Sequence, residues 1–403
     1  MKTGRIRLKS PEGRWTIAAS VLGSGAVFLE STVVNVALPG MARNLGTGMA
    51  GLQWVVNGYL LSLSALMLLG GSLGDFLSRR RVFAWGLIGF AVSTALCAVA
   101  PGLVVLVILR VLQGAAGALL VPNSLALLEE MFVEEDRGTA IGQWAGWSAV
   151  STAAGPLFGG WLVDAGNWRW VFASVVPFAL MAAWIALRRM PEGSMRTRDE
   201  SSSLLRDLDI AGAALATLGL GGLIGALISG PGRGFTDPLI LILLIGGTIL
   251  LAGFVAVERR ARFPLLPLDI FRIRQFSGAN LVTFFVYAAL GGVFFLLMIQ
   301  LQSVLGYSAL AAGASLLPIN ALLLLFSPLA GRLSGRYGPR WPMTLGAAVA
   351  GAGVLMLAMV RPGAGYVGTV LPGVLVFGAG LAAFVAPITA AVLGAVPDRQ
   401  TGV

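Results

Sequence analysis

Twelve long apolar runs, with only two charged residues among them, divide this chain of 403 residues, and each is long enough to cross a lipid bilayer as a helix. Hydrophobic residues make up 57% of the chain and charged residues only 11%. A bilayer core offers no water to backbone polar groups, so such runs must satisfy them within helices. The sequence therefore predicts an all-α polytopic membrane protein. The predicted spans are residues 15–39, 50–72, 82–101, 103–127, 140–163, 170–187, 210–229, 238–257, 276–302, 310–330, 341–360 and 366–390.

The net charge of +10 would suggest nucleic acid as a partner in a soluble protein, but the distribution of charge argues for a membrane. With the N-terminus in the cytoplasm, Lys and Arg gather in the cytoplasmic segments, as the positive-inside rule requires. We therefore expect contact with the lipid bilayer and no nucleic acid. Lys2 and Lys9 are the only lysines among 28 basic residues, which indicates a GC-rich bacterial genome. For a bacterial membrane protein we expect a place in the plasma (inner) membrane. The basic residues expected outside are Arg43, Arg169, Arg233 and Arg361.

A basic turn occurs twice between apolar runs, once in residues 71–81 (GSLGDFLSRRR) and again in residues 331–340 (GRLSGRYGPR). Both copies resemble the signature loop of the major facilitator superfamily, G-x-L-x-D-x-x-G-R-[RK]. The first copy departs from it at Ser78 and the second at Gly335. The resemblance implies a transporter built from two pseudo-repeat helical bundles. Asp75 could accept hydrogen bonds from backbone amides at a helix N-terminus, and Arg79 to Arg81 could reach acids or lipid phosphate. The alternative is that the loop only determines topology. The expected gate residues are Gly71, Asp75, Arg79, Arg80 and Arg336.

The spacing of the two loops predicts the organisation of the chain. Eight predicted spans separate the copies, whereas a plain duplication of six helices would separate them by six, so two helices are inserted between the halves. Four spans follow the first loop within its half and only two follow the second. We therefore expect a fourteen-helix protein whose last two spans are missing; a natural twelve-helix variant is the alternative. The predicted parts are an N-terminal six-helix bundle (1–187), a cytoplasmic linker (188–209), two inserted transmembrane helices (210–257) and an incomplete C-terminal bundle (258–403).

Glu30 is the only acid inside a predicted span, in the segment LESTVVNVALP of residues 29–39. A carboxylate in hydrocarbon must be paired or protonated, which makes it a candidate proton carrier. The segment resembles the first-helix motif of the fourteen-helix drug:proton antiporter subfamily, L-D-x-T-[VI]-[VI]-N-V-A-L-P, with Glu in place of the usual Asp. The alternative is a structural acid satisfied by polar neighbours.

Arg110 is the only basic residue inside a predicted span, and with Gln113 and Gly114 it resembles the superfamily motif R-x-x-Q-G, implicated there in proton coupling. A helix rises ~1.5 Å per residue, which places Arg110 and Glu30 at similar depths, roughly 10–14 Å below the outer surface. We expect the two to pair, with Arg110 holding Glu30 ionised until a proton or a cationic substrate competes. The alternative is a structural arginine tied to backbone carbonyls.

The fifth predicted span resembles the antiporter motif G-x8-G-x3-G-P-x2-G-G, with Ser151 at the middle glycine. Small residues allow close helix packing, and proline removes a backbone hydrogen bond. On physical grounds this indicates a tight, bendable helix contact. In the subfamily the motif accompanies export. The matching residues are Gly142, Gly155, Pro156, Gly159 and Gly160.

The resemblance implies a secondary transporter that exports small lipophilic, often cationic compounds in exchange for protons by alternating access. We expect a proton gradient as the driving force, no cofactor, no metal, a monomer and no enzyme activity. His is absent and the single Cys97 lies in a span, so neither a metal site nor a disulfide framework is indicated. A proton-coupled metabolite importer, a membrane-embedded lipid-modifying enzyme and a non-functional truncated fragment are the alternatives. The expected cavity residues are Asn35, Trp54, Tyr59, Phe285 and Gln300, although aromatic residues in the ninth span more commonly face lipid or a neighbouring helix.

Overall fold

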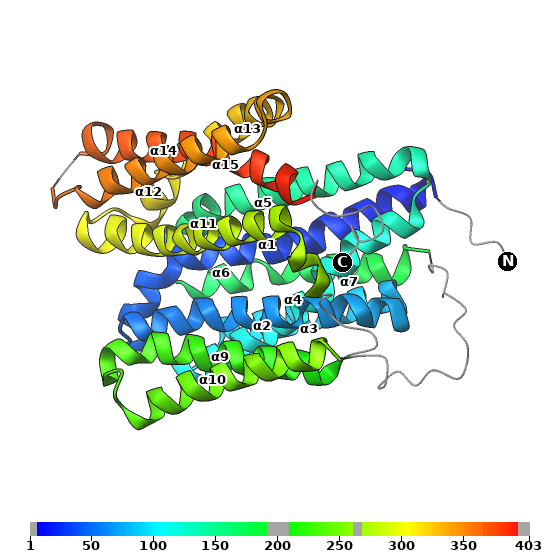
Figure 1. Ribbon diagram of the computed structural model, residues 1–403, viewed down its shortest axis with the longest axis horizontal. Helices are drawn as coiled ribbons and strands as arrows, with labels where there is room; N and C mark the ends of the chain where they lie inside the picture. Colours follow the sequence, from blue (N-terminus) through cyan, green and yellow to red (C-terminus); the bar gives the residue numbers. More distant parts are fainter. Residues whose placement is uncertain (1–5, 192–208, 261–267, 364, 394–403) are drawn as a thin grey trace. The chain divides into compact units, whose positions relative to one another are not determined.

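The computed structural model describes residues 6–191, 209–260, 268–363 and 365–393, and helices dominate these ranges (Figure 1). An isolated bridge between Ile6 and Phe132 is the only β pairing in them, so the prediction of an all-α protein is confirmed. The helices are α1 (Pro11–Leu45), α2 (Met49–Phe76), α3 (Arg79–Ala98), α4 (Leu103–Met131), α5 (Glu134–Ala165), α6 (Arg169–Ala173), α7 (Val176–Arg188), α9 (Ile210–Arg233), α10 (Pro238–Glu258), α11 (Arg274–Ile299), α12 (Ala309–Ala314), α13 (Leu317–Tyr337), α14 (Arg340–Ala358) and α15 (Leu371–Leu393), with a 3-10 turn at Leu268–Arg272 and π turns at Gln300–Val304 and Tyr366–Val370.

Eleven helices of the described chain are long and apolar enough to cross a membrane, one fewer than the sequence predicts. The difference is α5, which is long enough at 32 residues but whose mean hydropathy is lowered by Gly, Ser, Thr and Gln. Two predicted spans contain a break. The first falls between α6 and α7 and the second between α12 and α13, in each case just before a helix that carries proline in its first turn, Pro177 or Pro318. Proline lacks the N–H that would continue the preceding helix.

Local sequence signals set several helix ends. Ser10 caps α1 by accepting a hydrogen bond from the backbone N–H of Gly13, and Pro11 occupies the first helical position. Gly46 ends α1 with φ of 61°, a left-handed conformation that glycine adopts without steric penalty. Asp237 caps α10 in the same way as Ser10 caps α1, through the N–H of Leu239 at 2.8 Å.

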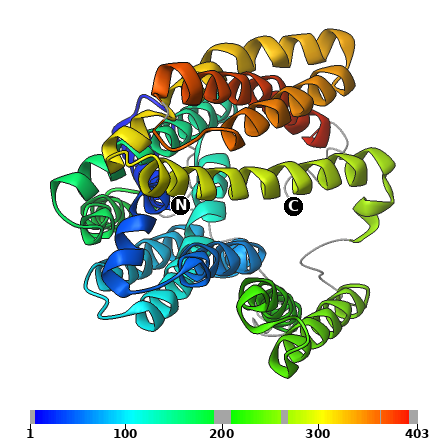
Figure 2. The ribbon, with the colours of Figure 1, turned by 90° about the vertical axis from the view of Figure 1, so that its left-hand side faces the viewer.

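The backbone contacts divide the chain into two compact units. The first contains Met1–Val34, Gly40–Gly155 and Gly166–Leu265, and the second contains Asn35–Pro39, Pro156–Ala165 and Leu266–Val403. In the first unit α4 packs against α2 and α3, and α9 packs against both α10 and α2. Figure 2 shows α9 and α10 lying side by side as a hairpin. In the second unit α15 packs against α13 and α14. The domain boundaries expected from the sequence stay a prediction.

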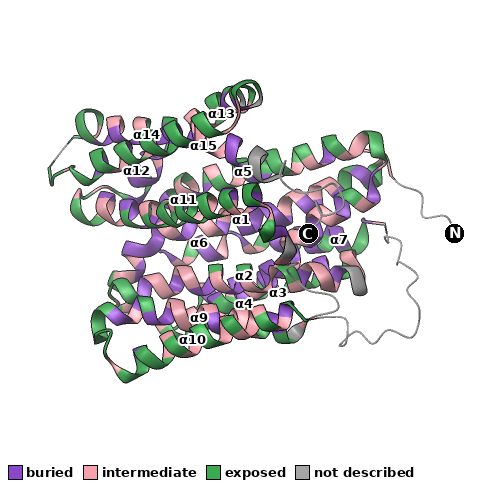
Figure 3. Cartoon of the chain, in the orientation of Figure 1, coloured by how far each residue is buried: buried purple, intermediate pink, exposed green. Residues whose placement is uncertain are grey.

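Each unit has its own apolar core, whereas many outward faces are also apolar. In the first unit Phe83, Leu87 and Phe90 of α3 are fully buried. By contrast, α10 exposes Ile242 to 66% and Ile249 to 63%, and Figure 3 shows exposed faces along α10 and α14. Large exposed aliphatic side chains on long uncharged helices are expected where the solvent is lipid. The chain is therefore a multi-pass membrane protein.

Candidate functional site

Glu30 of α1 and Arg110 of α4 form an ion pair inside the first unit. The Nη1 atom of Arg110 lies 3.1 Å from Oε1 of Glu30, and the two side chains are exposed by only 1% and 0%. This contact agrees with the similar depths that helix rise assigns to the two residues. A buried ion pair is far less unfavourable than either charge alone, but it still needs further hydrogen bonds to offset the loss of water.

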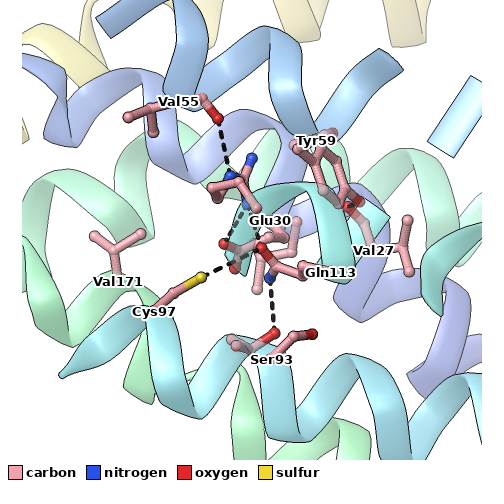
Figure 4. A network of polar contacts seen from close by, with 12 residues as sticks. Val27, Glu30, Val55, Tyr59, Ser93, Cys97, Gln113 and Val171 are labelled. Atoms are coloured by element: carbon pink, nitrogen blue, oxygen red, sulfur yellow. Dashed lines mark hydrogen bonds and ion pairs between the residues drawn. The ribbon is translucent and has the colours of Figure 1, made fainter. Parts of the chain in front are cut away.

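Gln113, one turn after Arg110 on α4, supplies one of these further hydrogen bonds. Its Oε1 accepts from Nη1 of Arg110 at 2.6 Å, so one guanidinium nitrogen serves both Glu30 and Gln113. Its Nε2 donates to Oγ1 of Thr94 on α3 at 2.7 Å. The thiol of Cys97, also on α3, lies 4.0 Å from the same amide oxygen (Figure 4). Side chains from α3 and α4 thus form a network of contacts that reaches the acid on α1.

Helix α2 holds the other side of the guanidinium. Nε of Arg110 donates to the backbone carbonyl of Val55 at 3.0 Å, and the guanidinium carbon lies 4.2 Å from the centre of the Tyr59 ring. The same guanidinium carbon lies 5.7 Å from the centre of the Phe172 ring of α6. Such cation–π contacts are strongest where water is excluded. Arg110 therefore keeps several partners besides Glu30.

Gly114 makes this arrangement possible. A Cβ atom placed on Gly114 would collide with the carbonyl oxygen of Tyr59 and with Oγ of Ser62. The missing side chain allows the backbones of α2 and α4 to approach closely, which brings Val55 within reach of Arg110. The glycine of the R-x-x-Q-G pattern thus has a structural role beside the polar pair.

The second carboxylate oxygen of Glu30, Oε2, is buried and has no hydrogen-bond partner among the described residues. Buried polar atoms usually have partners, so an exception calls for an explanation such as a proton or a water molecule at that atom. The position can take up a proton without breaking an existing hydrogen bond.

Two basic residues of the first signature loop bind backbone carbonyls of other helices. Arg80 donates from Nε and Nη2 to the carbonyls of Ala186 and Leu187, at 2.7 Å and 2.6 Å, and so caps the C-terminus of α7. Arg79 donates to the carbonyl of Ala126 on α4 at 3.0 Å and lies 3.8 Å from the carboxylate of Glu130. The sequence suggested acids or lipid phosphate as partners, and the carbonyls were not foreseen because helix C-termini carry no side-chain signal.

The other residues expected at the gate are less informative. Gly71 lies in α2, where an added Cβ would make only ordinary contact with Pro122. Arg336 of α13 is exposed and lies over the ring of Tyr337 at 5.4 Å. The side chain of Asp75 lies outside the described residues. The gate itself stays a prediction.

The antiporter motif lies at close helix contacts. A Cβ on Gly155 would collide with Oγ1 of Thr32 on α1, two residues from Glu30. In the second unit, the Pro156 carbonyl leaves no room for a side chain on Gly313 of α12, and a Cβ on Gly160 would meet the carbonyl of Ala309. Gly159 is buried, whereas Gly142 is exposed with open space around it.

Asp164, one turn after Gly160 on α5, stabilises the contact between α5 and α12. Its two carboxylate oxygens accept from the backbone N–H groups of Ala309 and Leu310 at 3.0 Å and 2.8 Å. Asp164 thus caps the first turn of α12, where a carboxylate also suits the helix dipole. This pairing could not be predicted from the sequence, because the two segments are 145 residues apart.

The expected cavity residues are divided between the two units. Tyr59 is fully buried over Arg110, and Trp54 packs on Gly225 of α9. In the second unit Asn35 is partly buried, and Nε2 of Gln300 donates to the carbonyl of Leu357 at 3.2 Å; Phe285 is 62% exposed. Their role in a cavity stays a prediction.

The described part of the chain contains no group of three or more His, Cys, Asp or Glu side chains able to hold a metal ion. What the site around Glu30 offers is a buried carboxylate paired with a guanidinium.

Comparison with known proteins places the chain in a family. Residues 20–403 match the family model described as Major Facilitator Superfamily. The multidrug resistance protein Stp of Mycobacterium tuberculosis is 33% identical over 388 residues, which cover 96% of this chain and 71% of the relative. The tetracenomycin C resistance and export protein of Streptomyces glaucescens is 33% identical over 389 residues, with the same coverage of 96% and 71%.

A solved structure supports the same fold. The structure of a bacterial homologue of the human lysosomal transporter Spinster superposes with a TM-score of 0.63 at 18% identity, covering 98% of this chain and 77% of that chain. At this identity the likeness concerns the fold alone. Together with the membrane-spanning helices, the match over residues 20–403 establishes that this chain is a transporter of the Major Facilitator Superfamily.

Proposed function

We propose that this transporter exports small lipophilic, often cationic compounds in exchange for protons by alternating access. The observation that carries the proposal is the buried pair of Glu30 and Arg110, in which one carboxylate oxygen has no partner among the described residues. An ionisable pair at this depth in a membrane helix is unfavourable for stability alone, which favours a functional role. Relatives named for multidrug resistance and for tetracenomycin C export support a small-molecule substrate that is exported.

The partners of Arg110 explain how protons could bind and leave reversibly. When Glu30 takes up a proton, the ion pair loses its charge attraction. Arg110 would then be an uncompensated buried cation if it had no other partners. Gln113, the Val55 carbonyl and the Tyr59 ring supply those partners. Arg110 is thus held in both protonation states, and the proton changes the charge of the site without dismantling it.

Exchange requires only that proton and substrate disfavour each other. A cationic substrate is attracted by a charged carboxylate and loses that attraction when Glu30 is protonated. A mutual penalty of about 1–3 kcal/mol is enough to couple two binding events substantially. The proton would enter from outside, neutralise Glu30 and leave to the cytoplasm, while substrate moves the other way.

The setting of this exchange belongs to the same proposal. The chain would lie in the inner membrane of a bacterium with its N-terminus in the cytoplasm and act as a monomer driven by the proton gradient. Arg79 and Arg80 would stabilise one state of the cytoplasmic gate through the ends of α4 and α7.

The test is transport of a fluorescent lipophilic cation by the full-length protein in everted vesicles. An imposed pH gradient should drive accumulation, and an uncoupler should abolish it. Glu30→Gln should accumulate nothing in response to the gradient but still bind the cation. Glu30→Asp, which keeps a carboxyl one methylene shorter, serves as the matched control and should retain coupling. Gradient-driven accumulation by Glu30→Gln at the parent rate would refute the assignment of the proton site.

A further inference from the structure

Thr94 of α3 contacts neither of the charged side chains, yet it determines how Gln113 can face them. Its Oγ1 lies 2.6 Å from the carbonyl oxygen of Phe90 and 2.7 Å from Nε2 of Gln113. A carbonyl can only accept, so the single hydroxyl proton of Thr94 is committed to Phe90. The lone pairs of Oγ1 are then the groups available to Gln113.

This commitment fixes the orientation of the amide. Gln113 must present its NH2 group to Thr94, because its carbonyl would face an oxygen with no proton to give. The amide oxygen is thereby turned toward Nη1 of Arg110, at 2.6 Å. The reverse orientation would place NH2 against the guanidinium and leave two donors without an acceptor. All three groups are buried, so water does not replace a lost partner cheaply.

We infer that Thr94 is a positioning residue for proton coupling: it fixes the Gln113 amide so that the amide oxygen shares Arg110 with Glu30. This inference rests on the proposed proton exchange at Glu30. Nη1 carries two hydrogens, so Gln113 and Glu30 both accept from this nitrogen and share its positive charge. Without Thr94 the amide turns freely and its oxygen can leave Nη1, so the guanidinium charge acts on the carboxylate alone and protonation of Glu30 is disfavoured. The other titratable groups around the site are Tyr59 of α2 and Cys97 of α3.

The test is the external pH that gives half-maximal proton-coupled transport. Thr94→Val keeps the shape of the side chain but removes the acceptor, and it should move this midpoint toward acid pH by about half to one unit. That shift is about a three- to tenfold change in proton concentration. Thr94→Ser keeps the oxygen and should restore the parent midpoint. The KM for substrate, measured at saturating proton concentration, should not change.

Ser93 provides a matched control. It is also buried, and its hydroxyl bonds to the carbonyls of Gly89 and Phe90, whereas the Gln113 amide bonds to Thr94. Ser93→Ala should therefore leave the midpoint unchanged, although it removes a buried hydroxyl from the same turn. If Thr94→Val is unstable, Thr94→Ala removes the same acceptor without adding a methyl in place of the oxygen and should show the same shift.

The inference is overturned if folded Thr94→Val and Thr94→Ala keep the parent midpoint, or if Ser93→Ala shifts it equally. Failure of the proposed function looks different. In that case Glu30→Gln retains gradient-driven transport in the same vesicles. Loss of coupling in Glu30→Gln together with no shift in the Thr94 variants would refute only the positioning role.

Discussion

Replacing Gly114 with alanine should damage the proton site through the backbone. The added Cβ would overlap the carbonyl oxygen of Tyr59, whereas ordinary contacts begin near 3.4 Å, so α2 and α4 must separate by about 1 Å. The hydrogen bond from Arg110 to the Val55 carbonyl, now 3.0 Å, would lengthen to about 4 Å and be lost. Overpacking of a tight contact costs about 1–3 kcal/mol, and loss of a hydrogen bond to a charged group adds about 1.5–3 kcal/mol.

We therefore expect Gly114→Ala to lose about 3 kcal/mol of stability and to transport more slowly in response to a pH gradient. The measurements are the apparent melting temperature in detergent and gradient-driven uptake in vesicles. Gly146→Ala on α5 is the matched control, because a Cβ there meets nothing within 4 Å. In that helix alanine should be neutral or stabilising by about 0.5–1 kcal/mol. A Gly114→Ala protein as stable and as active as the Gly146→Ala control would refute the argument from helix approach.

Three further predictions concern contacts away from Gly114. Arg80→Ala should lower the melting temperature, because the last carbonyls of α7 lose their cap at a cost of about 1 kcal/mol. Arg81→Ala removes an exposed side chain and should not lower it. Equal effects of the two substitutions would exclude the cap as the cause. Asp164→Ala should destabilise the contact of α5 with α12 by about 1 kcal/mol. Hydrogen exchange of the backbone amides of Ala309 and Leu310 should become faster, and unchanged exchange there would contradict the capping role. Cys97 is fully buried and is the only cysteine, so a water-soluble thiol reagent should label the protein slowly; rapid labelling of the resting protein would show that this region opens.

The sequence was sufficient for the fold class because the constraint is global. Long uncharged runs can only be helices in a membrane, and eleven of them appear as such in the described chain. The partition of 170–187 and 310–330 into shorter helices was missed, although Pro177 and Pro318 carried the signal. Element boundaries depend on local hydrogen bonding, which hydropathy does not register.

The charged pair could also be foreseen, since only one acid and one base lie in the spans and helix rise gives them similar depths. Its surroundings could not. Thr94 is one of several hydroxyl residues in apolar helices, and such residues commonly bond to a carbonyl of their own helix. Only the crossing of α3 and α4 gives it a second partner. The capping roles of Arg80 and Asp164 likewise depend on contacts between segments far apart in sequence.

The central claim is that substrate and proton compete through Glu30. The most direct measurement is the release of protons when a lipophilic cation is added to the purified protein in weakly buffered detergent solution, near the pH of half-maximal transport. We predict release by the parent protein and by Glu30→Asp, and none by Glu30→Gln. Equal release from Glu30→Gln would contradict it, because the proton would then come from another group.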